Sequence, residues 1–257
     1  MLAGANPKFE RHGYSMRKLL LLVALLVSGH PACSAPIGAI VRGYDYDSAK
    51  RVTIIHLVNT SQKEISALSF GLQTTSADGT VSPPGGNEFS LDFVNGIAQG
   101  KGGFAAGATF DQETAQPGPL KATIDLVAYA DGTADVLNQR AFESLIAGRK
   151  ARVSALRKIN ELVTKALADP NEKQPSRTVL AQLQSLLAAN RRHPIDGSTA
   201  YGGELQNAIQ NLTNLTRSPH LLEPAFESNQ LLQLVKSQEG RAAGILPHTD
   251  LVKAVQP

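Results

Sequence analysis

The sequence predicts an α+β protein in separate regions, an N-terminal antiparallel Ig-like β-sandwich followed by an all-helical C-terminal region. Up to about residue 130, apolar residues alternate with polar ones in short segments that turn residues separate. Beyond that point, apolar residues recur every three or four positions, as on one face of a helix. The change of period places the boundary at residue 133, which gives a sandwich over 36–133 and a helical region over 134–257.

A leader is expected over residues 1–35. From Met16 the chain has a short positive region, nine apolar residues from Leu19 to Val27, and small residues before position 36. This order is that of a secretory signal peptide, and the apolar run is shorter than the ~20 residues that span a bilayer. We therefore expect a signal peptide over 16–35 and export to the periplasm, cell envelope or medium, with Met1 or Met16 as the true start.

The fate of Cys33, the only cysteine, depends on where the leader is cut. Cleavage after Ala35 removes it and leaves a mature chain without disulfides. Cleavage before Cys33 leaves an N-terminal cysteine that can carry lipid. Ala32 fits the bacterial lipobox, whereas His30 and Pro31 depart from it. Plain cleavage near residue 35 is favoured, and lipidation of Cys33 is the alternative.

The positive charge of the whole chain lies in the leader. The chain has 25 basic and 22 acidic residues, of which the leader holds four and one, so the mature chain has 21 − 21 = 0. Its basicity is therefore no argument for a nucleic-acid partner. Residues 36–133 hold 6 basic and 10 acidic residues, whereas residues 134–257 hold 15 and 11. Net charges of −4 and +4 favour intramolecular docking of the helices on the β-domain.

Strands are expected where every second side chain is apolar. The segment 52–58 is apolar on both faces, which favours a central strand. About six short strands in some 95 residues, separated by Gly-, Pro- and Asn-rich turns and by no crossover helix, are typical of an antiparallel Ig-like sandwich. The other expected strands cover residues 37–44, 67–72, 88–93 and 121–128.

Four helices are expected after Thr133. The first covers 136–168 and carries a stripe at positions 142, 146, 149, 153, 156, 160, 163 and 167, which Arg149 and Asn160 interrupt. Asp169 and Pro170 end it. The next begin near Ser176, near positions 198–199 and at Pro224, and a last short turn follows position 249.

A basic cluster on the first helix is the main candidate contact surface. Its functional interpretation is a contact for an anionic partner, which is a phospholipid surface, an acidic glycan or the protein's own β-domain. A solvated helix face is the favoured interpretation, because charge runs on long helices are common. The external partner is expected to be a protein, a glycan or a membrane surface, and no nucleic acid. The cluster consists of Arg149, Lys150, Arg152, Arg157 and Lys158.

No pattern in the sequence predicts catalytic residues, a cofactor or a metal site. Asp45 and Asp47 alternate with tyrosines, which favours a polar strand end or turn over a calcium site. His56 lies in an apolar strand and is expected as a packed core or sheet residue. No histidine has a histidine or cysteine at the spacing of a zinc site.

Two short motifs resemble uncharacterised secreted bacterial proteins with an N-terminal Ig-like β-sandwich followed by helices. They are Val58-Asn59-Thr60-Ser61 before a strand and Tyr129-Ala130-Asp131-Gly132-Thr133 before a helix. The resemblance covers about residues 36–160 and implies export and an Ig-like domain without an activity. We therefore expect an exported non-enzymatic binding or envelope-associated protein. The alternatives are an extracytoplasmic hydrolase with a site not visible in sequence and a lipid-anchored envelope protein.

Overall fold

The computed structural model describes residues 37–75, 78–82, 87–95, 103–115, 120–217 and 223–254. Residues 37–255 group into one compact unit. The expected leader over 1–35, with Cys33, lies outside the described residues. None of the helices in the described part of the chain is long and apolar enough to cross a membrane.

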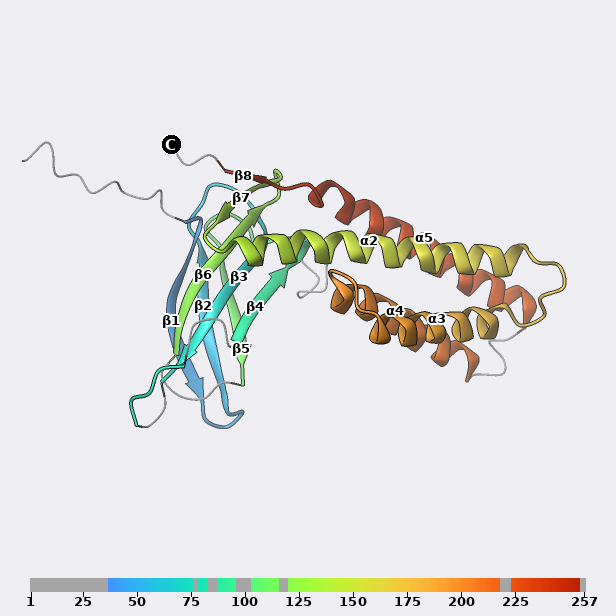
Figure 1. The fold of residues 1–257 in the computed structure, drawn as a ribbon, viewed down its shortest axis with the longest axis horizontal. Coiled ribbons are helices and arrows are strands. Elements are labelled where there is room, and N and C mark those ends of the chain that lie inside the picture. The colour runs from blue at the N-terminus through green and yellow to red at the C-terminus, as the bar shows by residue number, and fades with distance from the viewer. Residues whose placement is uncertain are drawn as a thin grey trace, which may run out of the picture. The chain divides into compact units, whose positions relative to one another are not determined.

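The strands form two sheets (Figure 1). The three-stranded sheet A has the order β1-β2-β5, and the five-stranded sheet B has the order β4-β3-β6-β7-β8. All neighbours are antiparallel except β7 and β8, which are parallel. The strands are β1 (Ala39–Asp47), β2 (Val52–Asn59), β3 (Ile65–Thr74), β4 (Asn87–Asp92), β5 (Thr109–Thr114), β6 (Leu120–Tyr129), β7 (Thr133–Val136) and β8 (Val252–Lys253).

One apolar core lies between the two sheets. Ile55 and Leu57 of β2 face Phe70 and Leu72 of β3 and Val127 of β6, and all five are fully buried. The alternation in the sequence produces this arrangement because successive strand residues point to opposite faces. The expected α+β class with separate regions of strands and helices is thus confirmed.

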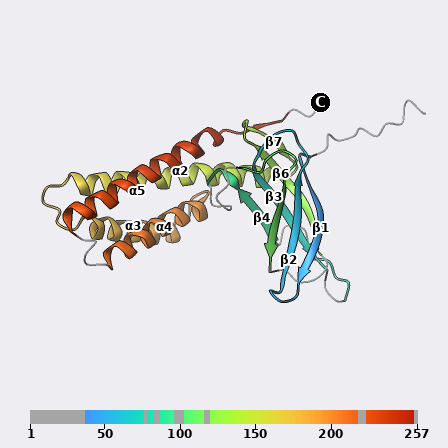
Figure 2. The ribbon, with the colours of Figure 1, turned by 180° about the vertical axis from the view of Figure 1, so that it is seen from behind.

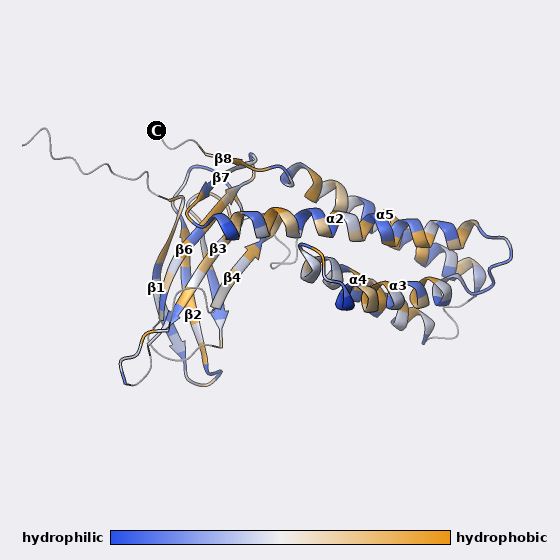
Figure 3. Ribbon diagram, viewed as in Figure 1, coloured by the Kyte–Doolittle hydropathy of each residue, from blue (hydrophilic) through white to orange (hydrophobic). Residues whose placement is uncertain are grey.

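Four helices follow the first seven strands (Figures 1 and 2). Their starts agree with the sequence pattern within about three residues, and Pro224 occupies the first turn of α5 as expected. Apolar residues (orange) and polar residues (blue) follow one another along α2 in Figure 3, and the apolar ones from Ile159 onward enter a core that is shared with the other helices. The helices are α2 (Gln139–Ala168), α3 (Pro175–Arg192), α4 (Ser198–Thr216) and α5 (Pro224–Ile245).

The boundary between strands and helices differs from the expected one. The turn at Asp131-Gly132 forms, with Gly132 at φ +85°, but it leads into β7 and not into a helix. Helix α2 begins only at Gln139, where the Asn138 side chain accepts the N–H groups of Arg140 and Ala141. After α5 the chain forms β8 beside β7, so the region after residue 133 is not entirely helical.

The first turns of α2 cover the outer face of sheet B. Ala141, Phe142 and Leu145 share a small core with Leu126 and Ala128 of β6. The side chains of β6 are therefore buried on both faces of the sheet. This contact fixes the start of α2 on the sandwich and places the following turn, with Arg149, above the end of β4.

Candidate functional site

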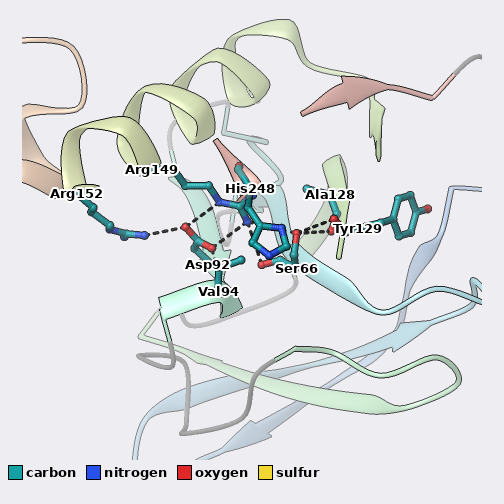
Figure 4. Close-up of polar contacts among 8 residues, drawn as sticks. All are labelled: Ser66, Asp92, Val94, Ala128, Tyr129, Arg149, Arg152 and His248. Atoms are coloured by element: carbon teal, nitrogen blue, oxygen red, sulfur yellow. Dashed lines mark hydrogen bonds and ion pairs between the residues drawn. The ribbon is translucent and has the colours of Figure 1, made fainter. Parts of the chain in front are cut away.

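Arg149 is the centre of a buried polar network between the sandwich and α2 (Figure 4). Its side chain is 0% exposed. It occupies a position of the apolar stripe, so the helix directs it inward with Phe142 and Val153. A guanidinium is always charged and is buried at great cost unless its donors find acceptors.

Asp92, the last residue of β4, supplies the opposing charge. Its Oδ1 accepts a hydrogen bond from Nη2 of Arg149 at 3.0 Å, and its Oδ2 accepts from Nε of the same guanidinium at 3.3 Å. Arg152, one turn further along α2, donates from Nη1 to Oδ2 at 2.7 Å. The Asp92 side chain is only 8% exposed, so two cations neutralise one nearly buried carboxylate.

Backbone groups complete the coordination of Arg149. Nη2 also donates to the carbonyl of Ser66 at 3.2 Å and lies 3.3 Å from its hydroxyl, while Nη1 donates to the carbonyl of His248 at 3.0 Å. Ser66 belongs to β3 and His248 to the turn after α5. A single side chain therefore connects β3, β4 and the C-terminal segment. Burial, together with the Arg149 charge, lowers the pKa of His248.

Beside this network lies a polar cleft with a volume of about 690 Å³. The end of β4, one side of α2 and the first three turns of α4 form its walls. Its volume lies within the range typical of small-molecule sites. The polar side chains that line it are Ser90, Asp92, Ser144, Arg149, Arg152, Ser198, Thr199, Glu204 and Asn207.

The rest of the predicted basic cluster lines a different hollow. Lys150, Arg157 and Lys158 surround a depression of about 580 Å³, together with Tyr201 and the exposed Leu246. Two of the cations are already paired. Lys150 lies 3.1 Å from a carboxylate oxygen of Asp250, and Lys158 lies 2.7 Å from one of Glu161. Arg157 forms no ion pair with another described residue.

The structure thus divides the predicted cluster. Lys150, Arg157 and Lys158 line one hollow, where Arg157 alone has no ion pair with another described residue, whereas Arg152 is bound to Asp92 and Arg149 is buried. Of the partners expected for the cluster, Arg149 and Arg152 contact the protein's own β-domain through Asp92, and Arg149, at 0% exposed, is not available to an external partner. The physical reason is its position on the inward stripe of α2.

His56 is a sheet residue of β2, which is one of the two expected placements, but it is not packed in the core. Its side chain is 28% exposed and lies between two carboxylates, with Nδ1 2.8 Å from Oδ1 of Asp111 and Nε2 3.0 Å from Oδ2 of Asp45. These hydrogen bonds, that of Asp111 first, raise the pKa of His56. Asp47 behaves as expected of a turn residue, since its Oδ1 accepts the N–H groups of Ala49 and Lys50.

Asp92, Ser66, His248 and Glu204 are the site residues that sequence reasoning missed. One usable signal was present, because a lone arginine within an apolar stripe requires an acidic partner once the stripe is buried. The sequence does not reveal which acid, since Asp92 lies 57 positions away at a strand end. No group of three potential metal ligands lies together among the described residues.

Comparison with known proteins adds little to this description. No family model matches the chain, and no curated protein matches it. A solved structure of a hypothetical protein from Peptoclostridium difficile 630 matches with 15% identity and a TM-score of 0.26, over 43% of this chain and 91% of that one. At this TM-score, the likeness carries no argument about fold or function.

Proposed function

We propose that the chain is an exported, non-enzymatic binding or envelope-associated protein whose sandwich is Ig-like. The sheet order supports the Ig-like assignment. In Ig sandwiches, strands A, B and E are neighbours in one sheet, and strands C, F and G are neighbours in the other. Here β1, β2 and β5 are neighbours in sheet A, and β3, β6 and β7 in sheet B. β4 is then an additional strand beside the counterpart of strand C.

The basic hollow on the helices is the observation that carries the binding function. Lys150, Arg157 and Lys158 converge there beside the exposed side chain of Leu246, and Glu161 and Asp250 reduce the net charge to +3 − 2 = +1. Since Arg157 has no ion-pair partner among the described residues, it is the cation most available to an anionic partner. A basic rim beside an apolar side chain favours an anionic phospholipid surface.

Charge reversal at Arg157 tests this proposal. We expect Arg157→Glu to weaken cosedimentation with vesicles that contain 30% anionic lipid by about thirtyfold, because each cation near such a surface contributes about 1 kcal/mol to binding and the reversal changes the charge by two. Arg191→Glu, an equal charge change at an exposed position of α3 away from the hollow, is the matched control. Equal binding by the wild type, R157E and R191E would exclude the hollow as the contact. Binding to an acidic polysaccharide in place of vesicles would assign the partner to glycans.

The alternatives have less support in the geometry. A hydrolase requires an acid or base that is free to exchange protons with its substrate. Asp92 is unsuited to that role, because both of its oxygens accept hydrogen bonds from arginines. Lipid anchoring through Cys33 stays a proposal about the leader, which lies outside the described residues.

A further inference from the structure

We propose that the polar cleft between β4, α2 and α4 binds a small zwitterion, namely a free amino acid or a short peptide with a free carboxylate and a free ammonium group. This site is separate from the basic hollow and requires no membrane partner. Two walls of the cleft present opposite charges, and the groups on both walls have unused hydrogen-bonding capacity.

The first wall suits a carboxylate. The N-cap residue of α4, Gly197, has φ +73° and provides no side-chain cap, and the first-turn residues Thr199 and Ala200 line the cleft. First-turn N–H groups lack partners within a helix and favour anions. Arg152 adds a full charge nearby. Its Nη1 binds Asp92, while the side chain remains 23% exposed at the cleft and its other nitrogens have no hydrogen-bond partner among the described residues.

The second wall suits an ammonium group. Glu204 of α4 is only 3% exposed, and its Oε1 accepts a hydrogen bond from Arg241 at 2.8 Å. Its Oε2 is buried without a hydrogen-bond partner in the described structure. A buried acceptor without a partner costs free energy, more so when it is charged. Because the Glu204 side chain lines the cleft, a change of its rotamer would present Oε2 to the ammonium group of a ligand, and this donor would satisfy the oxygen.

The two walls together select the class of ligand. A simple anion would be attracted by Arg152 and the start of α4 but repelled by Glu204, which lines the same cleft. A simple cation would be attracted by Glu204 but repelled by Arg152 and the start of α4. A carboxylate and an ammonium group on one small molecule satisfy both walls. The volume of about 690 Å³ leaves room for two or three amino-acid residues.

Calorimetric titration of the purified full chain tests the proposal. The probes are an equimolar mixture of free L-amino acids and trialanine, each compared with inorganic phosphate and with N-acetylalanine amide, which lacks both charges. We expect the zwitterions to bind and the two comparison compounds not to bind. Glu204→Gln should weaken binding at least about tenfold, the effect of losing one charge-assisted hydrogen bond.

A second variant keeps the test decisive if Glu204→Gln fails to fold. Thr199→Pro removes one N–H donor from the cleft, and proline is tolerated in the first turn of a helix. It should also weaken zwitterion binding. Glu227→Gln is the control, because Glu227 is a similarly buried glutamate of the bundle that does not line the cleft. The absence of zwitterion binding at millimolar concentration would overturn the proposal, as would equal binding of phosphate or equal affinity of Glu204→Gln, Thr199→Pro and Glu227→Gln.

Discussion

At the scale of single residues, Arg149 explains why a charge lies in the interior. Its three guanidinium nitrogens all donate hydrogen bonds, to Asp92, to the Ser66 carbonyl and to the His248 carbonyl. A buried pair of this kind adds little net stability relative to an apolar pair, but removal of one partner leaves an uncompensated charge. The main effect of Arg149 is therefore to favour one arrangement of β3, β4 and the C-terminal segment over others.

Replacement of Asp92 should show this asymmetry. We expect Asp92→Ala to lower the free energy of unfolding by about 3 kcal/mol, because Arg149 stays buried without its counter-charge. Urea denaturation followed by circular dichroism measures the change. The double variant D92L/R149M removes both charges and fills the space with apolar side chains. Its free energy of unfolding should fall clearly less than that of Asp92→Ala. A loss below about 1 kcal/mol for Asp92→Ala alone would contradict the central role of this pair.

At the scale of elements, the sequence predicted the strands and helices in which apolar residues recur at a regular spacing. Strands β3 and β6 and all four helices were identified, because their apolar residues repeat over many positions. β5 was missed because its sequence, TFDQET, contains a single apolar residue, Phe110, and its place in sheet A depends on pairing with β2. The sequence does not encode such a pairing locally.

Strands β7 and β8, which precede and follow the helices in the chain, were missed for a related reason. β7 has four residues and β8 has two, and each is fixed by its neighbour in sheet B. Their ladder joins segments more than 100 positions apart, with the Val252 N–H donating to the Gly132 carbonyl at 2.9 Å. The site depends on the same kind of distant contact, since Asp92, Arg149 and Glu204 come from three different elements. For this reason the sequence predicted the basic residues on α2 but not their partners.

The start of α4 offers a test at this scale. A Cβ on Gly197 would lie 2.6 Å from the carbonyl oxygen of Ala147 on α2, and φ at +73° disfavours any L side chain. Gly240 in α5 has neither constraint. We expect Gly197→Ala to destabilise the protein by about 1–3 kcal/mol and Gly240→Ala to stabilise it by up to about 1 kcal/mol. Thermal denaturation of both variants measures the signs, and the same sign for both would refute this account of the α2–α4 contact.

At the scale of the whole described unit, the four helices come between two strands of the same sheet in the order of the chain. The chain leaves sheet B after β7, forms α2 to α5 and returns to pair β8 with β7. Helix α2 is continuous over 30 residues. Ala141 and Phe142 belong to the core against sheet B, and Ile159 and Val163 belong to the core of the bundle. Neither core can therefore be lost without a disturbance of the helix that serves both.

We accordingly expect the sandwich and the bundle to unfold in one transition. Hydrogen exchange followed by mass spectrometry should give similar opening free energies for peptides from β6 and from α4, because α2 couples the two cores. Val252→Pro, which removes the N–H that donates to Gly132, should lower both values together by about 1 kcal/mol. Lys253→Pro is the matched control, since the N–H groups that donate to the carbonyls of Gly132 and Ala134 are those of Val252 and Ala254. Loss of protection in α4 at free energies well below those of β6 in the wild type would show two independently unfolding parts and contradict this coupling.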